Sequence, residues 1–283
     1  MNVYYLAIVL SAFLFSLQFL FSDGYQRESG CGWNSALKYS LYSSAAGLLA
    51  LFAINGFSLR VSAFSLAVAA VYSAVCIALN YFSVKALRIA NLSVYSVFSM
   101  IGGMLLPFLY GIACGEELRA TRIICCILIT AAVLMNVGKG KGSGNAFMCY
   151  MAVFILNGSV GVISKFHQSY REYCVESAYF LMLSKIITAT FCIFFILLGR
   201  KRDFSVSKKA FAYSAGGAVL NSIGNLILLI ALQRLPASLQ YPLLTGGVIV
   251  FSTATELVRK SRLTKREIAA AFIAFAATAA MAI

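Results

Sequence analysis

Charge is scarce in this chain of 283 residues, because Asp, Glu, Lys and Arg together make up only 11% of it. The acidic residues are the scarcest, with nine Asp and Glu against 23 Lys and Arg, and there is one histidine. Soluble globular domains are about 25% charged. A soluble globular enzyme is therefore excluded, and the 61% of hydrophobic residues indicates a membrane protein.

Motifs for nucleotide, metal or covalent chemistry are also missing. The glycine-rich run 138–144 has neither a preceding strand nor the G-K-[ST] ending of a phosphate-binding loop. The eight cysteines contain no C-x-x-C pair. An enzyme within the membrane would need a nucleophile with its base, or a metal cluster, inside the apolar blocks, whereas His167 lies at the end of one. We expect no enzyme activity, no catalytic residue, no metal and no cofactor.

The hydrophobic residues form ten blocks, each near the length of about 20 residues that crosses a bilayer. In lipid each span must satisfy its own backbone hydrogen bonds, so the blocks are predicted to be helices. The first block lacks the basic start and the cleavage site of a signal peptide, and we expect it to be a span. The fold class is an all-α membrane protein with ten transmembrane helices, at 3–21, 34–54, 64–87, 92–113, 120–137, 146–166, 176–198, 209–232, 237–256 and 267–283.

The chain divides into two similar halves. The Gly/Lys linker 138–145 separates a first five-helix repeat, 1–137, from a second, 146–283. The shift that brings Asn225 onto Asn80 also aligns Ser238 with Ser93 and Gly247 with Gly102. Because five is odd, the second copy enters the membrane in the opposite orientation. Two inverted five-helix repeats are typical of transporters.

The basic residues predict an orientation. Fourteen Lys and Arg lie in the odd-numbered gaps between blocks and five lie in the even-numbered gaps. The positive-inside rule then places the odd-numbered gaps in the cytoplasm and both termini outside. The net charge of +14 fits contact with lipid headgroups rather than nucleic acid. We expect a multi-pass protein of the plasma (inner) membrane.

Short motifs in both halves resemble the drug/metabolite transporter superfamily, in particular its ten-helix EamA-type exporters. They are Ala86-Leu87-Arg88 after the third block, Gly115-Glu116 after the fourth, and the segment 231–238, whose sequence ends in Pro-Ala-Ser. Glu256 stands near the place of a second Gly-Glu. Lys38 and Lys185, early in the second and seventh blocks, also match the family's pattern.

The chain departs from that pattern in places. A proline common early in the fourth span is missing near Gly102, and Thr255 replaces the glycine before the second glutamate. Relatives keep both termini in the cytoplasm, opposite to the charge count. The resemblance implies a substrate cavity between the two halves and alternating access by rocking of bundles.

Polar residues recur at helical spacing inside the blocks. Ser11 and Gln18 lie seven apart and share one face, and Asn221 and Asn225 lie four apart. Such side chains either bind a polar solute or hydrogen-bond between helices. The predicted substrate-binding residues are Ser11, Gln18, Tyr72, Asn80, Tyr95, Ser99, Asn157, Lys185, Asn221, Asn225 and Tyr241.

Lys185 lies about 10 Å inside the seventh block by helix rise, where an ammonium group requires a counter-charge or water. We favour binding of a substrate carboxylate or phosphate over snorkelling or pairing with Glu176. Lys38, Lys85 and Lys165 lie closer to block ends, where snorkelling is expected. None of the nine acids lies near the middle of a block, although antiport of protons against cationic drugs needs such a carboxylate.

These features predict a transporter of small polar metabolites, an amino acid or related carboxylate exporter or facilitator that works by alternating access. The alternative is a multidrug efflux transporter of organic cations. A scaffold or receptor without transport is a third reading. The expected partners are the small-molecule substrate and membrane lipids, with the protein a monomer or a homodimer.

Overall fold

The structure is a computed structural model that describes residues 3–30, 32–89, 92–117, 119–135, 144–199, 202–258 and 265–282. Within these residues the regular structure is ten α-helices and no strand, as expected. The helices are α1 (Val3–Ser29), α2 (Trp33–Ile54), α3 (Ala63–Ile89), α4 (Leu92–Ala113), α5 (Ala120–Met135), α6 (Gly144–Ser169), α7 (Ser177–Leu198), α8 (Lys208–Leu232), α9 (Ala237–Val258) and α10 (Lys265–Ala282).

Six helices are long and apolar enough to cross a membrane, namely α1, α2, α3, α6, α7 and α8. Shorter apolar stretches lie in α4, α5 and α10, counted over the described residues alone. A chain with this many spanning helices is a multi-pass integral membrane protein.

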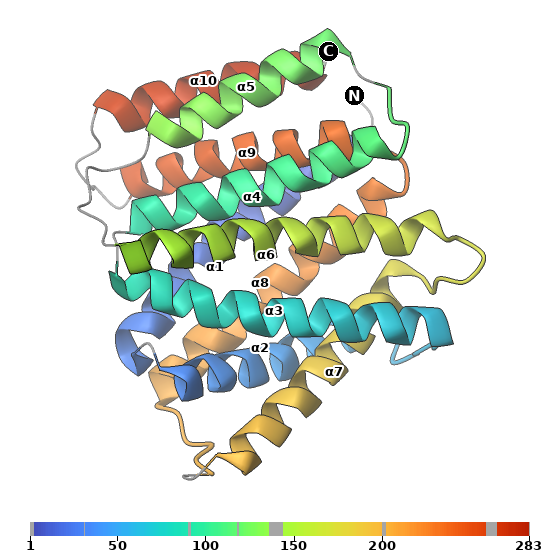
Figure 1. The fold of residues 1–283 in the computed structure, drawn as a ribbon, viewed down its shortest axis with the longest axis vertical. Coiled ribbons are helices and arrows are strands. Elements are labelled where there is room, and N and C mark those ends of the chain that lie inside the picture. The colour runs from blue at the N-terminus through green and yellow to red at the C-terminus, as the bar shows by residue number, and fades with distance from the viewer. Residues whose placement is uncertain are drawn as a thin grey trace.

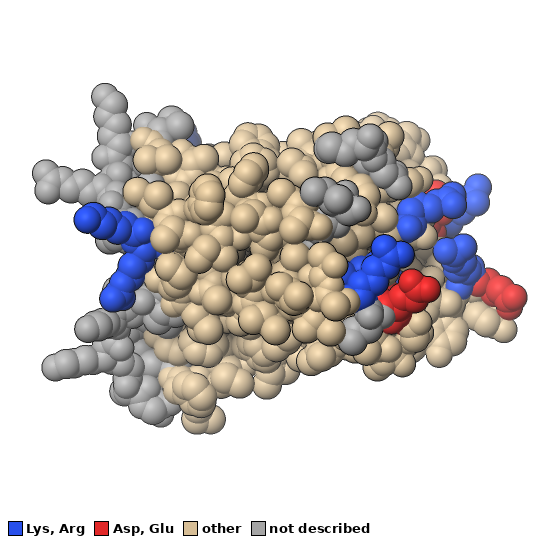
Figure 2. Space-filling model, turned by 90° about the horizontal axis from the view of Figure 1, so that it is seen from above, with Lys and Arg blue, Asp and Glu red and all other residues tan. Residues whose placement is uncertain are grey.

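The helices run alongside one another, so that their connections gather at two ends of the molecule (Figure 1). We call the end that holds both termini and the α2–α3, α4–α5, α6–α7 and α8–α9 connections the even-loop end. The opposite end, where α1 meets α2 and α7 meets α8, is the odd-loop end. On the face shown in Figure 2, uncharged side chains fill the middle and the described Lys, Arg, Asp and Glu lie at the two ends. This banded surface is what a bilayer requires.

The first connection is shorter than the sequence indicated. The gap Ser22–Trp33 is mostly helical, because α1 continues to Ser29. Tyr25 is 1% exposed, and its hydroxyl donates to the Ser35 carbonyl at 2.9 Å. Burial of this ring stabilises the extra turns, and Gly30, with φ +71°, turns the chain toward α2.

The structure describes only the last two residues of the predicted linker 138–145. Residues 138–143 lie outside the described residues. Its last two residues, Gly144 and Asn145, belong to α6 rather than to a linker.

The packing order is the same in the two halves of the chain. α1 packs against α8 and α9, and α6 packs against α3 and α4. α2 contacts α7 and α8, while α7 contacts α2 and α3. The pairs α5·α10 and α4·α9 also touch. Adding or subtracting five from each helix number therefore turns each of these pairs into another of them or into itself, whereas the pair α5·α9 has no equally extensive counterpart between α4 and α10.

Glycine allows α4 and α6 to approach closely. Gly102 is buried, and a Cβ atom there would meet the backbone carbonyl of Phe154 on α6. A Cβ at Gly158 would meet the Gly102 carbonyl at 2.6 Å. Backbone atoms cannot move aside as a flexible side chain can, so both positions require glycine.

We therefore expect Gly102→Ala to destabilise the fold by about 1–3 kcal/mol, the usual effect of overpacking. Gly32→Ala is the matched control, because no atom lies within 4 Å of the place of its Cβ. Thermal unfolding of the detergent-purified variants measures both. Equal melting temperatures for Gly102→Ala and the wild type would contradict this view of the α4–α6 contact.

Candidate functional site

A cavity of about 310 Å³, lined by both polar and apolar side chains, lies in the centre of the helical bundle. Side chains from α1, α2, α3, α4, α6, α7, α8 and α9 line it, and α5 and α10 contribute none of the described lining. It reaches Tyr25 and Tyr39 toward the odd-loop end, and it stops at Leu181 and Tyr241 toward the even-loop end. The volume is at the lower end of the range for small-molecule sites, so the cavity fits a small solute.

Most of the residues predicted for a binding site meet in this cavity. Ser11 does not line it, because this buried side chain donates to the Gly224 carbonyl at 3.0 Å and so joins α1 to α8. The side chain of Tyr95 lies outside the described residues. The nine predicted residues in the lining are Gln18, Tyr72, Asn80, Ser99, Asn157, Lys185, Asn221, Asn225 and Tyr241.

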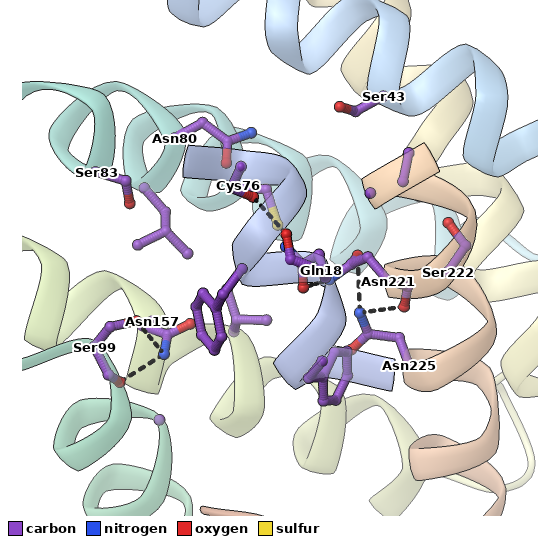
Figure 3. A pocket seen from close by; sticks show the side chains of 18 of the residues that line it. Gln18, Ser43, Cys76, Asn80, Ser83, Ser99, Asn157, Asn221, Ser222 and Asn225 are labelled. Carbon is purple, nitrogen blue, oxygen red and sulfur yellow. Dashed lines mark hydrogen bonds between the residues drawn. The ribbon is translucent and has the colours of Figure 1, made fainter. Parts of the chain in front are cut away.

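Amide groups on the cavity wall also hold the helices together (Figure 3). Asn157 of α6 donates through Nδ2 to the carbonyl of Ser99 on α4 at 2.7 Å. Asn221 of α8 donates to Oε1 of Gln18 on α1 at 3.0 Å. Asn225 donates to the Asn221 carbonyl at 3.0 Å. Asn157 and Asn221 thus pair two helices and also line the cavity, so one side chain can serve both helix pairing and solute binding.

The carbonyl partners fix which amide atom remains for a solute. Because a carbonyl only accepts, the NH₂ groups of Asn157 and Asn225 must face Ser99 and Asn221. No described residue donates to their Oδ1 atoms. Both amides therefore offer the cavity an acceptor, suited to an ammonium, amide or hydroxyl group.

Lys185 of α7 is the charged residue in the described lining of the cavity. The four ion pairs in the described part of the chain join other residues, so pairing with Glu176 is not seen. The thiol of Cys76 on α3 is close enough to interact with it electrostatically. An ammonium group withdrawn from water with no carboxylate beside it favours binding of an anion.

The other lysines of the spans have different surroundings. Lys38 pairs with Asp203 at 2.6 Å and Lys165 with Glu116 at 2.8 Å, so each of these two ammonium groups contacts a carboxylate outside the helices. The ammonium of Lys85 lies 5.8 Å from the centre of the Tyr81 ring. The hydrogen bond from Lys38, and those from Ser205, hold the pKa of the Asp203 carboxyl well below its usual range.

Most of the hydroxyl groups in the lining lie outside the predicted set, which includes only those of Tyr72, Ser99 and Tyr241. Serines are frequent along the whole chain, so their spacing carries little signal. Ser40 of α2 is in direct contact with a predicted residue, because its hydroxyl accepts a hydrogen bond from Asn80 Nδ2 of α3 at 2.8 Å. Ser222 Oγ is buried with no hydrogen-bond partner among the described residues. The unpredicted hydroxyls are those of Ser22, Ser40, Ser43, Ser44, Ser83, Ser164, Ser184, Thr188, Ser222 and Thr245, together with the phenols of Tyr25 and Tyr39.

His167 occupies a structural place near the even-loop end. Its Nε2 and the Ser65 hydroxyl lie 2.8 Å apart, and its ring stacks on Phe180 with centroids 4.0 Å apart. The residue is 1% exposed and is not part of the described cavity lining. Among the described residues, no group of three or more His, Cys, Asp or Glu is placed to hold a metal ion.

Comparison with known proteins bears on the fold. No protein-family model matches the chain, and no curated protein matches it either. Chains of solved structures do match, 29 of them. One is described as "Crystal structure of protein"; it has a TM-score of 0.74 and 16% identity, over 99% of this chain and 96% of that chain. At this identity the likeness shows the fold alone, along the whole chain.

Proposed function

We propose that the chain is a transporter of small polar metabolites, an amino acid or related carboxylate, rather than an enzyme. The observation that carries the proposal is the central cavity, which holds Lys185 with no carboxylate in its described lining. A substrate carboxylate would bind the Lys185 ammonium. A substrate amino group would bind the acceptor oxygens of Asn157 and Asn225, so both ends of an amino acid find partners.

The proposed architecture is ten spans in two inverted five-helix repeats. Its support is the packing order, in which α1 with α8 corresponds to α6 with α3, and α2 pairs with its own equivalent α7. In such transporters the substrate lies at the interface of the repeats near the midplane. The two halves would then rock about this cavity to expose it alternately on the two sides.

A contact between two motifs supports kinship with the drug/metabolite transporter superfamily and its EamA-type exporters. The carboxylate of Glu116, in the Gly-Glu motif, accepts from the backbone N–H groups of Ala237 and Ser238, each at 2.9 Å. Ala237 and Ser238 are the end of the Pro-Ala-Ser motif. The two motifs that resemble this family come from different halves of the chain and are in direct contact through these hydrogen bonds.

The proposed orientation puts the odd-loop end in the cytoplasm and both termini outside, in the plasma (inner) membrane. The cavity extends toward the odd-loop end, so the structure corresponds to a state turned toward the cytoplasm. A monomer contains the whole cavity, which makes a homodimer unnecessary for transport.

A ligand screen followed by counterflow tests the proposal. The purified protein is melted with amino acids, other carboxylates, sugar phosphates, nucleobases and cationic dyes, since a ligand of the folded state raises the melting temperature. We expect stabilisation by amino acids or related carboxylates, and counterflow of the same compounds in proteoliposomes. Stabilisation by cationic dyes alone would favour a multidrug transporter. No change in melting temperature with any of the compounds would favour a scaffold or receptor.

A further inference from the structure

A second cavity, which we call the vestibule, lies at the even-loop end. It has a volume of about 580 Å³ and is lined by the ends of α6 and α8, by Glu116 after α4, and by the α6–α7 and α8–α9 connections. Glu116, Lys165, Gln168 and Arg234 are among its polar lining residues. The chemistry of the central cavity does not account for this hollow.

The two cavities are separated by about one helical turn. On α6, Ser164 lines the central cavity, and Lys165 and Gln168 line the vestibule. On α8, Leu229 lines the central cavity, and Leu232 lines the vestibule. One turn of helix is about 5.4 Å long, so the layer between the cavities is thin.

Hydrogen bonds from α6 to its neighbours close this layer. Gln168 donates through Nε2 to the Leu229 carbonyl on α8 at 2.9 Å and to the Ser177 hydroxyl on α7 at 3.1 Å. The Tyr241 hydroxyl of α9 donates to the Gly161 carbonyl at 3.2 Å. These bonds tie α6 to α7 and α8 at Gln168 and to α9 at Gly161, about two helical turns earlier on α6.

An ion pair at the same end ties α6 to the start of α9. Lys165 contacts Glu116 at 2.8 Å, and their side chains are only 18% and 12% exposed. Burial would raise the pKa of the Glu116 carboxyl, but hydrogen bonds from Lys165 and from the backbone of Ser238 and Ala237 outweigh it and lower that pKa. The carboxylate thus caps α9 and holds Lys165 at once.

We propose that the central cavity and the vestibule are two parts of one translocation path, and that the Glu116–Lys165 pair with Gln168 is the gate between them. The inference rests on the proposed transport function. In the structure the gate is closed, which leaves the central cavity reaching toward the odd-loop end alone. Opening would part α6 from α8 and α9 and join the two cavities.

The double role of Glu116 makes this gate able to open. When Lys165 moves away, Glu116 keeps two backbone N–H donors at the start of a helix, so the carboxylate is not left without partners. The lysine that leaves faces the vestibule, where water can solvate it. Only the ion pair between Lys165 of α6 and Glu116 breaks, and the hydrogen bonds from Glu116 to the start of α9 remain.

Thiol labelling of Cys76, which lines the central cavity, tests the gate. Cys76 is kept and the other cysteines are replaced, and a membrane-impermeant thiol reagent is added to either face of oriented vesicles. We expect Lys165→Met to raise the labelling rate from the even-loop face about tenfold, and Lys165→Arg to restore the slow rate. Lys85→Met is the control, because this exposed lysine lies outside both described linings.

The outcomes separate the gate from the transport function. Unchanged even-loop labelling in Lys165→Met, in a protein that still performs counterflow, would overturn the gate and leave the proposed function standing. Faster labelling in a protein without counterflow for any compound would support the Lys165 contact as the barrier between the two cavities and overturn the proposed transport function. If Lys165→Met does not fold, Gln168→Leu replaces it, with the same expected increase and the same refuting result.

Discussion

Lys185→Met is expected to weaken both the stabilisation by the substrate and its counterflow strongly, while the protein itself melts at the same temperature or higher. The substrate loses a charge-assisted hydrogen bond worth about 1.5–3 kcal/mol, which weakens binding by about tenfold to a hundredfold. The unliganded protein gains stability, because Met removes an ammonium group that has no counter-charge among the described residues. The melting temperature, with and without ligand, measures both effects in one titration.

Two further variants make this result specific to the cavity. Lys185→Arg keeps the charge and should retain measurable binding, and Lys85→Met removes a lysine outside the described lining and should bind as the wild type does. Wild-type affinity in Lys185→Met would show that the ammonium does not contact the substrate. A melting temperature well below the wild type would show that Lys185 is structural instead.

Glu116→Ala is expected to have the largest effect on stability of any single substitution discussed for this chain. It removes the cap of α9 and leaves Lys165 without its partner in a place that is 18% exposed. Loss of a helix cap costs about 0.5–2 kcal/mol, and loss of the charge-assisted bond to Lys165 costs about 1.5–3 kcal/mol more. Glu117→Ala is the matched control, because its carboxylate is 83% exposed and lies 4.0 Å from Arg119.

The contribution of Glu116 also has a definite pH dependence. Its pKa is lower in the folded protein than in the unfolded chain, so its stabilisation is complete above the unfolded value of about 4.3. It is lost as the pH falls below that value toward the folded pKa. The difference in melting temperature between wild type and Glu116→Gln should therefore shrink in acid. A difference that stays constant from pH 7 to a pH well below the unfolded value would contradict the assignment of the cap.

The sequence predicted the helices well because lipid leaves few alternatives for an apolar block of about 20 residues. The expected block 92–113 coincides with α4. The start of the first connection was missed, since Ser22 and Asp23 look like the end of a span. What continues the helix there is burial of Tyr25 against residues of α2, a contact between elements that local composition does not encode.

The candidate site was predictable to the extent that it uses rare residues inside spans. An amide or a lysine in an apolar block stands out, which is how Asn157 and Lys185 were identified. Ser11 has the same spacing signal, and only its bond to Gly224 shows that it faces α8. The double role of Glu116 was likewise invisible, because its partners come from α6 and from the start of α9.

The absence of α5 and α10 from the described cavity lining bears on how the protein enters the bilayer. These two helices pack on each other, and α10 also packs on α9, so eight helices suffice to enclose the solute. In the proposed topology, a repeat with four helices, an even number, would end on the side of the membrane where it began. The second repeat would then insert in the same orientation as the first. In the proposed transporter, the outer pair would lie outside the described cavity lining, yet it would let two successive copies of one unit cross the membrane in opposite directions.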